Sequence, residues 1–266
     1  MVITLVNDTF NINNNGTTIS AMRFAEVLAR RGHQIRILTC GDPAKSGKDQ
    51  NTGFEMFYLP EFKIPIASRL AHKQNTLFAK PVRSILEKAI SGSDVVHIYQ
   101  PWALGRSAQK AARRMNIPAI AAFHIQPENI TYNIGLKSVP LVGHLVYFMF
   151  YLLFYRRFTH IHCPSKFIAA QLRNHGYRSR LHVISNGVHP AFCPPDQPKE
   201  HSFDPIKILM IGRLSPEKRQ DVLIRAVMRS RYADRIQLYF AGKGPWGKKL
   251  RRLGSKLPNP PVFGYY

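Results

Sequence analysis

The sequence has few acidic residues, few cysteines and none of the common hydrolase or metal-site motifs. It has 15 Asp and Glu against 38 Lys and Arg, so the carboxylate pairs that glycoside hydrolysis needs are scarce. Cys40, Cys163 and Cys193 lie far apart, which disfavours a disulfide scaffold or a structural zinc site and favours a reducing compartment. Neither H-E-x-x-H nor G-x-S-x-G occurs. We therefore expect no metal and no serine-hydrolase chemistry.

A long, clean hydrophobic run is also lacking. The first apolar run, residues 2–6, is too short for the hydrophobic region of a secretory signal. Residues 138–155 carry no formal charge, but Pro140, Gly143 and His144 interrupt the first third. The sequence favours a buried or interfacial helix there, with a transmembrane helix as the alternative.

Positive charge is abundant. The formal net charge is +23 and the pI is near 10.3, in a chain whose 45% apolar content is typical of a folded protein. Such a surface attracts phosphates of nucleotides, lipid headgroups or nucleic acid. No RNA-binding, zinc-finger or basic-zipper pattern is present, so nucleic acid is supported by charge alone and is not an expected partner.

Short apolar runs alternate with helical patterns, which is typical of βαβ units around a parallel sheet. The predicted strands are 2–6, 35–38, 54–59, 94–99, 119–123, 161–163 and 182–184. The predicted helices run from about 17 to Gly32 and near 104–115, 144–157 and 165–174. The fold class is therefore α/β.

Residues 185–205 interrupt this alternation with five prolines, which indicates a linker between domains. We expect one domain at 1–184 and a second at 206–266. The second has strands near 207–212 and 236–242, helices near 217–229 and 246–254, and the start of a strand at 262. Two βα units make about half of a usual α/β domain, so we expect this one to be incomplete.

Two strand-to-helix turns are candidate phosphate sites. The turn at 13–17 includes Gly16, but its spacing alone favours an ordinary Asx-rich turn. The turn after residue 211 clusters Arg213, Lys218 and Arg219 at a helix start, where the helix dipole disfavours cations unless an anion offsets them. Its alternative is a solvated basic turn. Gly242 and Gly244 follow the next strand at the same sheet edge.

A further candidate group follows the strand at 119–123. His124 comes directly after that strand, and Gln126, Glu128 and Asn129 lie in the same loop. Ligands of open α/β sheets bind beyond the carboxyl ends of strands. A lone histidine is as often structural, and both interpretations stay open.

Two segments have the pattern of membrane-facing surfaces. Residues 61–90 interleave six Lys and Arg with apolar residues, and residues 147–155 form an aromatic run. Basic amphipathic segments bind anionic lipid, which predicts an anionic membrane surface as a partner. The alternative for 61–90 is a helix that packs its apolar face on the sheet.

The chain resembles glycosyltransferase family 4, whose members are retaining nucleotide-sugar enzymes of GT-B fold. The resemblance is carried by IGRLSPEKRQDVLIRAV, VISNGVHPAF, FAEVLARRGHQIRILT and YFAGKGP. The segments HIYQPWALG and FHIQPENITYNIGL further resemble members that glycosylate diacylglycerol or phosphatidylinositol. The resemblance implies two Rossmann-like domains, a UDP- or GDP-sugar donor, a lipid or other hydroxyl acceptor and no cofactor.

The resemblance also implies roles for individual residues. Arg213 and Lys218 match the cations that stabilise the leaving diphosphate, and His124 matches a histidine beside the reacting sugar. Gly16 matches the first-loop contact to the donor diphosphate, with Asn15 in place of a second glycine. The donor side further includes Gly242 and Gly244, and the acceptor side comprises Asn13, Gln126, Glu128 and Asn129.

Two departures from the family pattern stand out. Arg219 occupies a position where glycine is common, and the family's E-x7-E carboxylates would fall beyond Tyr266. We therefore expect the 266-residue chain alone to turn over little. The main hypothesis is a cytoplasmic glycosyltransferase, peripheral on the inner membrane face, that acts on a lipid. The alternative is a non-catalytic remnant that binds membranes or nucleic acid through its basic surface.

Overall fold

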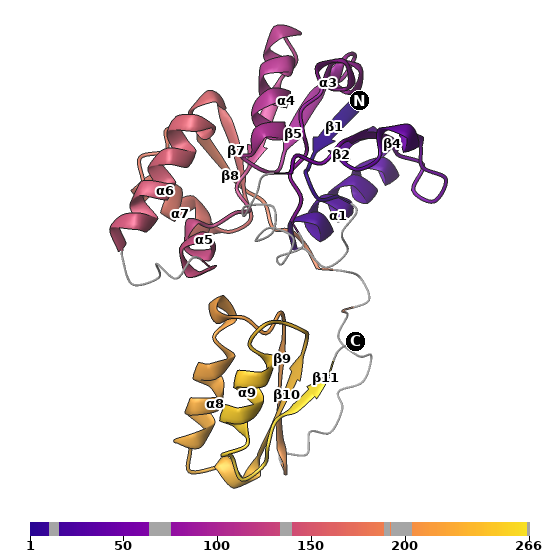
Figure 1. The fold of residues 1–266 in the computed structure, drawn as a ribbon. Coiled ribbons are helices and arrows are strands. Elements are labelled where there is room, and N and C mark those ends of the chain that lie inside the picture. The colour runs from indigo at the N-terminus through magenta and orange to yellow at the C-terminus, as the bar shows by residue number, and fades with distance from the viewer. Residues whose placement is uncertain (11–15, 64–75, 134–139, 189–191, 193–203, 265–266) are drawn as a thin grey trace. The chain divides into compact units, whose positions relative to one another are not determined.

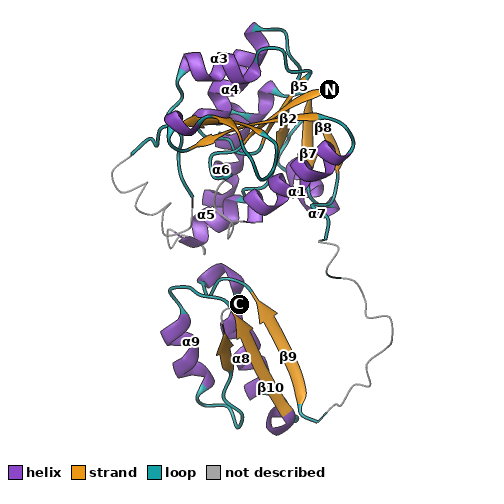
Figure 2. Cartoon of the chain, turned by 90° about the vertical axis from the view of Figure 1, so that its right-hand side faces the viewer, coloured by secondary structure: helices purple, strands orange, loops and turns teal. Residues whose placement is uncertain are grey.

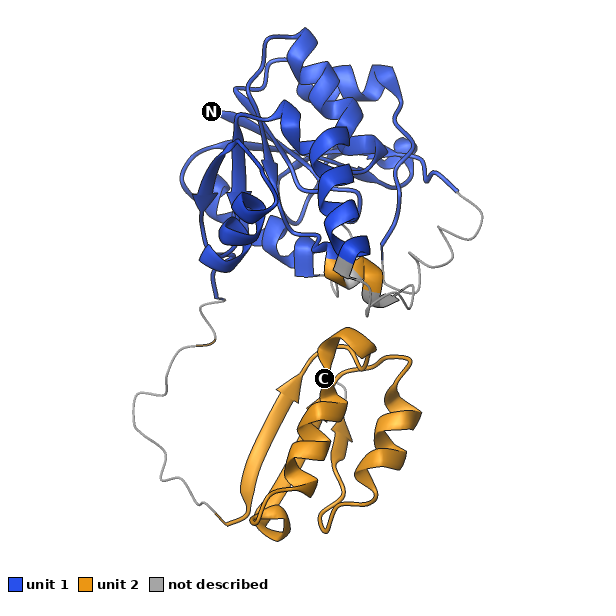
Figure 3. Cartoon of the chain, turned by 90° about the vertical axis from the view of Figure 1, so that its left-hand side faces the viewer, with its two compact units in different colours: residues 1–127, 140–189 blue, residues 128–139, 190–266 orange. Residues whose placement is uncertain are grey.

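The computed structural model describes residues 1–10, 16–63, 76–133, 140–188, 192 and 204–264 (Figure 1). The chain divides into two compact units, which Figure 3 colours separately. The first comprises residues 1–127 and 140–189, and the second comprises 128–139 and 190–266. Most of the proline-rich segment lies outside the described residues.

An eight-stranded sheet forms the centre of the first unit, with strand order β3-β4-β2-β1-β5-β6-β7-β8. The short β3 runs antiparallel to β4, and each of the other neighbouring pairs is parallel. Because the strands are parallel, their carboxyl ends meet at one edge of the sheet. The strands are β1 (Val2–Val6), β2 (Gln34–Cys40), β3 (Gly47–Lys48), β4 (Glu55–Leu59), β5 (Val95–Ile98), β6 (Ala119–Ala122), β7 (His160–Cys163) and β8 (Arg180–Val183).

Helices cover this sheet from both sides (Figure 2). The buried alanines of α1 (Gly16–Arg30) pack in one cluster with Leu5, Ile37 and other strand residues. A second cluster combines alternate strand residues with α3 (Arg83–Ile90), α4 (Ala103–Arg114), α6 (Pro140–Leu153) and α7 (Lys166–Asn174). Burial on both sides explains why the predicted strands are apolar almost throughout.

The second unit has a three-stranded parallel sheet of order β11-β10-β9. The strands are β9 (Ile206–Ile211), β10 (Ile236–Ala241) and β11 (Val262–Gly264). Both α8 (Gln220–Met228) and α9 (Gly247–Gly254) pack into one core with these strands. Side chains that point away from that core, such as Leu209 and Ile211, are exposed.

The predicted strands are confirmed, and three helix boundaries are corrected. The helix predicted at 217–229 begins as a 3-10 turn, Pro216–Lys218, and α8 starts only at Gln220 because Arg219 adopts a left-handed backbone conformation. The helix predicted at 144–157 starts earlier, at Pro140, and ends at Leu153 before a 3-10 turn, Tyr155–Arg157. Within 61–90, the structure describes one helix, α3 (Arg83–Ile90), and residues 64–75 lie outside the described residues.

The two predicted membrane-facing segments behave differently. In α3, Leu86, Ala89 and Ile90 are buried in the core, so its apolar face packs on the sheet as the alternative interpretation held. In α6, Tyr147 is buried, but Leu141, Leu145 and Phe148 are more than half exposed. Among the helices of the described residues, none is long and apolar enough to cross a bilayer.

Candidate active site

Buried polar residues follow β1 at the carboxyl edge of the first sheet. Asn7, Asp8 and Thr9 are almost fully buried. The backbone N–H of Asp8 donates to Oε1 of Gln100 at 2.7 Å, and Oδ1 of Asp8 accepts from the backbone N–H of Ala79 at 2.9 Å. These bonds join the ends of β1 and β5 to the segment that precedes α3.

Asp8 has an unusual carboxyl group. Burial raises its pKa to about 7, although hydrogen bonds from the backbone N–H groups of Ala79 and Asp8 itself oppose the shift. Asp8 was not among the residues predicted for the site. Its signal in the sequence is the same as that of His124, since it is a polar residue directly beyond the end of a buried strand.

His124 follows β6 and lies in an aromatic box. Its ring stacks on Tyr99, with centroids 5.4 Å apart and planes 5° apart, and it meets His162 edge-on at 5.5 Å. His97 contacts both Tyr99 and His162, with centroid distances of 4.5 and 5.6 Å. Phe24 of α1 closes the box against His162 at 5.2 Å.

The three histidines of this box are held in their neutral form. Burial, followed by repulsion from His162, lowers the pKa of His124 to about 3. Burial likewise lowers the pKa of His97 and that of His162. Nε2 of His124 is buried and has no hydrogen-bond partner among the residues that the structure describes. His124 can therefore offer a neutral imidazole nitrogen to a ligand. It would act as a hydrogen-bonding group and not as a general acid, because its pKa is far below 7.

The box does not form a metal centre. In the part of the chain that the structure describes, no group of three or more His, Cys, Asp or Glu could hold a metal ion. The rings instead contact one another through their faces and edges.

The structure brings together only some of the other site residues that the sequence predicts within 1–184. Gly16 is the first residue of α1, and a methyl group added there would meet no atom of the described residues within 4 Å. Asn13 lies outside the described residues. Gln126 is half-buried and follows His124, whereas Glu128 and Asn129 lie on α5 (Pro127–Asn133) and belong to the second unit. The side chain of Asn129 is outside the described part.

Arg213 lies in the turn after β9, where a buried carboxylate orients it. Its Nη2 donates to Oε1 of Glu217 at 2.9 Å, and the Ser215 hydroxyl donates to the same oxygen at 2.6 Å. Burial alone would raise the pKa of Glu217, but the bonds from Ser215 and Arg213 outweigh it and lower that pKa. The anion that we expected to offset these cations is therefore supplied in part by the chain itself.

Lys218 is exposed at the end of the 3-10 turn and is not part of α8. Its Cδ and Cε atoms are the nearest neighbours of Gly212, with both at 3.9 Å from where a Cβ would stand. In the described residues, no acidic side chain forms an ion pair with Lys218. Its ammonium group can therefore bind an anion beside Arg213.

Gly242 and Gly244 allow two strand-end turns to touch. A Cβ on Gly242 would overlap the carbonyl oxygen of Gly212, and one on Gly244 would overlap the carbonyl of Leu214. Hydrogen bonds hold the turns together, from Leu214 N–H to the Lys243 carbonyl at 3.0 Å and from Trp246 N–H to the Leu214 carbonyl at 2.9 Å. The glycines thus bring the turn after β10 against Arg213.

Two family models match the chain in succession. The model of Glycosyltransferase Family 4 matches residues 14–192, which is more than half of the sequence. The model of Glycosyl transferases group 1 matches residues 195–262. The boundary between the matches falls within the predicted linker.

Curated relatives agree with these matches. A GDP-mannose-dependent alpha-mannosyltransferase of Corynebacterium glutamicum is 28% identical over 95% of this chain and 60% of its own length. An alpha-monoglucosyldiacylglycerol synthase of Streptococcus pneumoniae is 25% identical over 97% of this chain and 59% of its own length. The chain thus spans about three-fifths of the relatives that it matches.

A solved structure shares the fold. HepE of Anabaena, crystallised with UDP and glucose, matches all of this chain and 69% of its own with a TM-score of 0.60 at 14% identity. The likeness confirms the predicted GT-B type of α/β fold. The family match over residues 14–192 shows that the chain belongs to glycosyltransferase family 4.

Proposed function

We propose that this protein transfers a sugar from a nucleoside-diphosphate sugar to the hydroxyl of a membrane lipid, with retention and without a metal cofactor. The observation that carries the proposal is the pair of cations beside β9. Arg213 is oriented by Glu217, and Lys218 is exposed without an ionic partner among the described residues. Family membership supports the reaction class.

The chemistry of sugar transfer needs this arrangement. As the bond to the anomeric carbon lengthens, negative charge builds up on the departing diphosphate. Arg213 uses one of its five N–H groups on Glu217, which leaves the others for phosphate oxygens. Lys218 adds a second, mobile cation. A cation held in place and a second, mobile one can stabilise the leaving group without a metal.

On the other side of the reaction, His124 is the residue that we assign to the sugar. Its imidazole is neutral, and its buried Nε2 has no hydrogen-bond partner in the described part of the chain, so a sugar hydroxyl would complete its hydrogen bonding. We assign Gln126 and Glu128 to the acceptor side because both follow the carboxyl end of β6, where ligands of open α/β sheets bind. Gly16, which no described residue crowds, suits close approach of the donor diphosphate.

Both nucleotide classes remain candidates for the donor. The Corynebacterium relative is named for GDP-mannose, and the Anabaena structure contains UDP. The Streptococcus relative is named for a glucosylated diacylglycerol, which supports a lipid acceptor here.

We further propose that the protein sits on the anionic inner face of a membrane, with α6 as the apolar contact. Leu141, Leu145, Phe148 and Met149 are exposed at spacings that place them on one side of the helix. The helix leads into Arg156 and Arg157, both exposed. An apolar stripe beside basic residues is the pattern of an interfacial helix.

Calorimetric titration of the 266-residue chain with UDP and GDP, with EDTA and with Mg²⁺, tests the donor site. We expect Arg213→Ala and Lys218→Ala each to weaken binding by about tenfold or more, since a charge-assisted hydrogen bond contributes about 1.5–3 kcal/mol. Lys248→Ala removes an exposed charge from α9 and should change nothing. Unchanged affinity in both site variants would remove the diphosphate assignment.

A further inference from the structure

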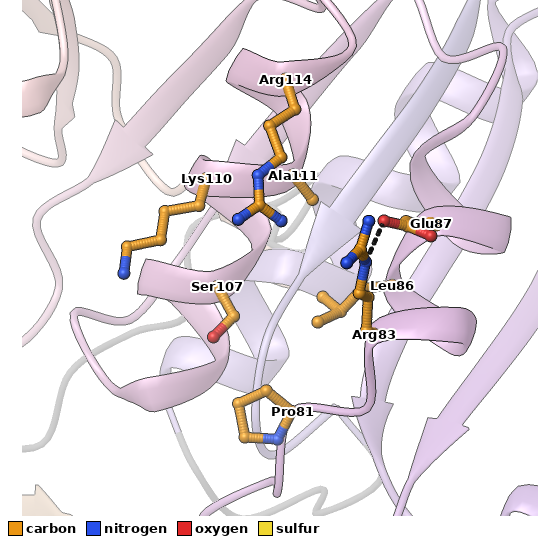
Figure 4. Close-up of a pocket in the computed structure, with 8 residues that line it drawn as sticks. All are labelled: Pro81, Arg83, Leu86, Glu87, Ser107, Lys110, Ala111 and Arg114. Carbon is orange, nitrogen blue, oxygen red and sulfur yellow. Dashed lines mark hydrogen bonds and ion pairs between the residues drawn. The ribbon is translucent and has the colours of Figure 1, made fainter.

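A pocket of about 250 Å³ lies between α3 and α4 (Figure 4). Its wall consists of residues from these two helices and the segment before α3, and none of the residues assigned to donor or acceptor lines it. Both helices pack in the cluster on the side of the sheet opposite α1. The lining residues are Pro81, Arg83, Leu86, Glu87, Ser107, Lys110, Ala111 and Arg114.

The wall of this pocket, the α3–α4 groove, is basic. Lys110 and Arg114 are four residues apart on α4 and so lie on one side of that helix. The guanidinium of Arg114 points towards Arg83 of α3, whereas the long side chain of Lys110 extends away from α3 at the edge of the groove (Figure 4). Glu87 is the groove's acidic residue, and it pairs with Arg83 at 2.7 Å. The two cations of α4 have no ion pair among the described residues, so the groove keeps an uncompensated positive charge.

Two further features of the groove suit a phosphate group. Val82 caps α3 without a side-chain hydrogen bond, and Pro81 directly before it lines the groove, so the uncapped first turn of α3 lies at its end. Ser107 supplies a hydroxyl donor from α4. Leu86 and Ala111 are buried beneath these groups, and an apolar floor strengthens the attraction of an anion to the cations above it.

Like charges continue along the same helix. Burial is the main cause that lowers the pKa of Arg157. Repulsion from Arg156 and from Arg106 and Arg113 of α4 lowers that pKa further, so these cations lie near one another. Repulsion of this kind is relieved when an anion binds among the cations. Basic residues therefore lie on two sides of α4. One side lines the α3–α4 groove, and the other lies near Arg157.

We propose that the α3–α4 groove binds a phosphate group, with Lys110 and Arg114 as its principal contacts. The phosphate belongs to a lipid headgroup or to a soluble phosphate ester, because both present the same dianionic or monoanionic oxygens to a basic groove. The groove is a second anion site, separate from the cations at Arg213 and Lys218, and it does not depend on the proposed transfer reaction.

The test compares two double variants of the full chain. Lys110→Ala with Arg114→Ala removes the groove cations, and Arg30→Ala with Arg31→Ala removes two exposed cations from the end of α1, on the opposite side of the sheet. Each is titrated with sn-glycerol 3-phosphate in solution. Each is also sedimented with phosphatidylcholine vesicles that contain phosphatidic acid or, as a phosphate-free anion, oleate.

We expect the groove variant to lose at least about tenfold in affinity for phosphate while the α1 variant keeps it. Binding of glycerol phosphate in solution identifies a soluble ester as sufficient, and binding only of phosphatidic acid vesicles identifies a headgroup. Equal losses in the two variants, a loss of oleate-vesicle binding in the groove variant as large as its loss of phosphate binding, or no binding of either phosphate probe would each overturn the proposal. Circular dichroism of the variants excludes misfolding as the cause of a loss.

Discussion

At the scale of single residues, Asp8 links burial to pH. Its pKa of about 7 in the folded chain lies above the ordinary value of 3.8, so the folded state holds the proton more tightly than the unfolded chain. Its contribution to stability is therefore full below about pH 4, declines as the pH rises towards 7 and is constant above that. The shift corresponds to about 3–5 kcal/mol.

We predict that Asp8→Asn removes this dependence. The amide oxygen can still accept from the Ala79 N–H, and the side chain can no longer ionise. The variant should gain stability relative to the parent chain between pH 4 and 8. Urea unfolding at several pH values measures the difference, and a difference that is the same at every pH would contradict the assignment of the titration to Asp8.

Arg219 is the second residue with a clear energetic consequence. It adopts φ 55° and ψ 33°, a left-handed conformation that costs a non-glycine residue about 1–2 kcal/mol. Glycine adopts this conformation without strain, which fits the sequence observation that Arg219 occupies a position where the family commonly has glycine. The ion pair with Asp221, at 3.5 Å and half exposed, stabilises the turn little.

Arg219→Gly should therefore stabilise the second unit by up to about 1 kcal/mol, because relief of the strain exceeds the greater backbone entropy of glycine in the unfolded chain. Arg219→Ala is the matched variant, since it also loses the ion pair but keeps the strain. Thermal unfolding should rank glycine above arginine and alanine. If alanine and glycine stabilise equally, strain at this residue is not the cause.

At the scale of elements, the second unit depends on the contact between the turns after β9 and β10. Gly244 packs against the backbone of Leu214, so a methyl group there must push the two turns apart. This contact also fixes where Arg213 lies, because Arg213 directly precedes Leu214. Packing and placement of the cation therefore have one cause.

Gly244→Ala should destabilise the second unit by about 1–3 kcal/mol, as overpacking does in well-packed cores. It should also weaken nucleoside-diphosphate binding. Gly247→Ala is the control, because the nearest atom to its new methyl group, Cδ1 of Leu214, is at an ordinary contact distance of 3.6 Å. Chemical denaturation checks both, and a Gly244→Ala variant as stable as Gly247→Ala would refute the close approach.

At the scale of the whole molecule, the +23 charge and the exposed stripe of α6 predict a two-part attraction to membranes. Salt near 1 M shortens the Debye length to about 3 Å and should remove the electrostatic part but not the apolar part. The two parts can therefore be separated by ionic strength.

Leu145→Ser with Phe148→Ser should abolish the salt-resistant fraction of binding to anionic liposomes. Val27→Ser with Val222→Ser removes exposed apolar side chains from α1 and α8 and should leave it unchanged. Sedimentation at low and high salt gives both fractions. Binding that does not depend on the anionic lipid content would contradict the electrostatic contribution. Complete release of the parent chain at high salt would contradict the apolar contribution.

The sequence by itself determined the α/β class, the order of its strands along the chain and the turns that carry Gly16, His124 and Arg213. Those features depend on local periodicity and on glycine and proline at strand ends, which act within a few residues. The family resemblance likewise depended on contiguous segments. Such signals survive without knowledge of what packs against them.

Only the tertiary structure decided which strands are neighbours, that His124 shares a box with His97 and His162, and that Glu217 orients Arg213. It also decided that α3 buries its apolar face while α6 exposes part of its own. Hydropathy alone cannot separate these cases, because both helices are amphipathic or apolar in sequence. Burial depends on partners far along the chain, and burial is the main cause of the shifted pKa values of Asp8 and His124.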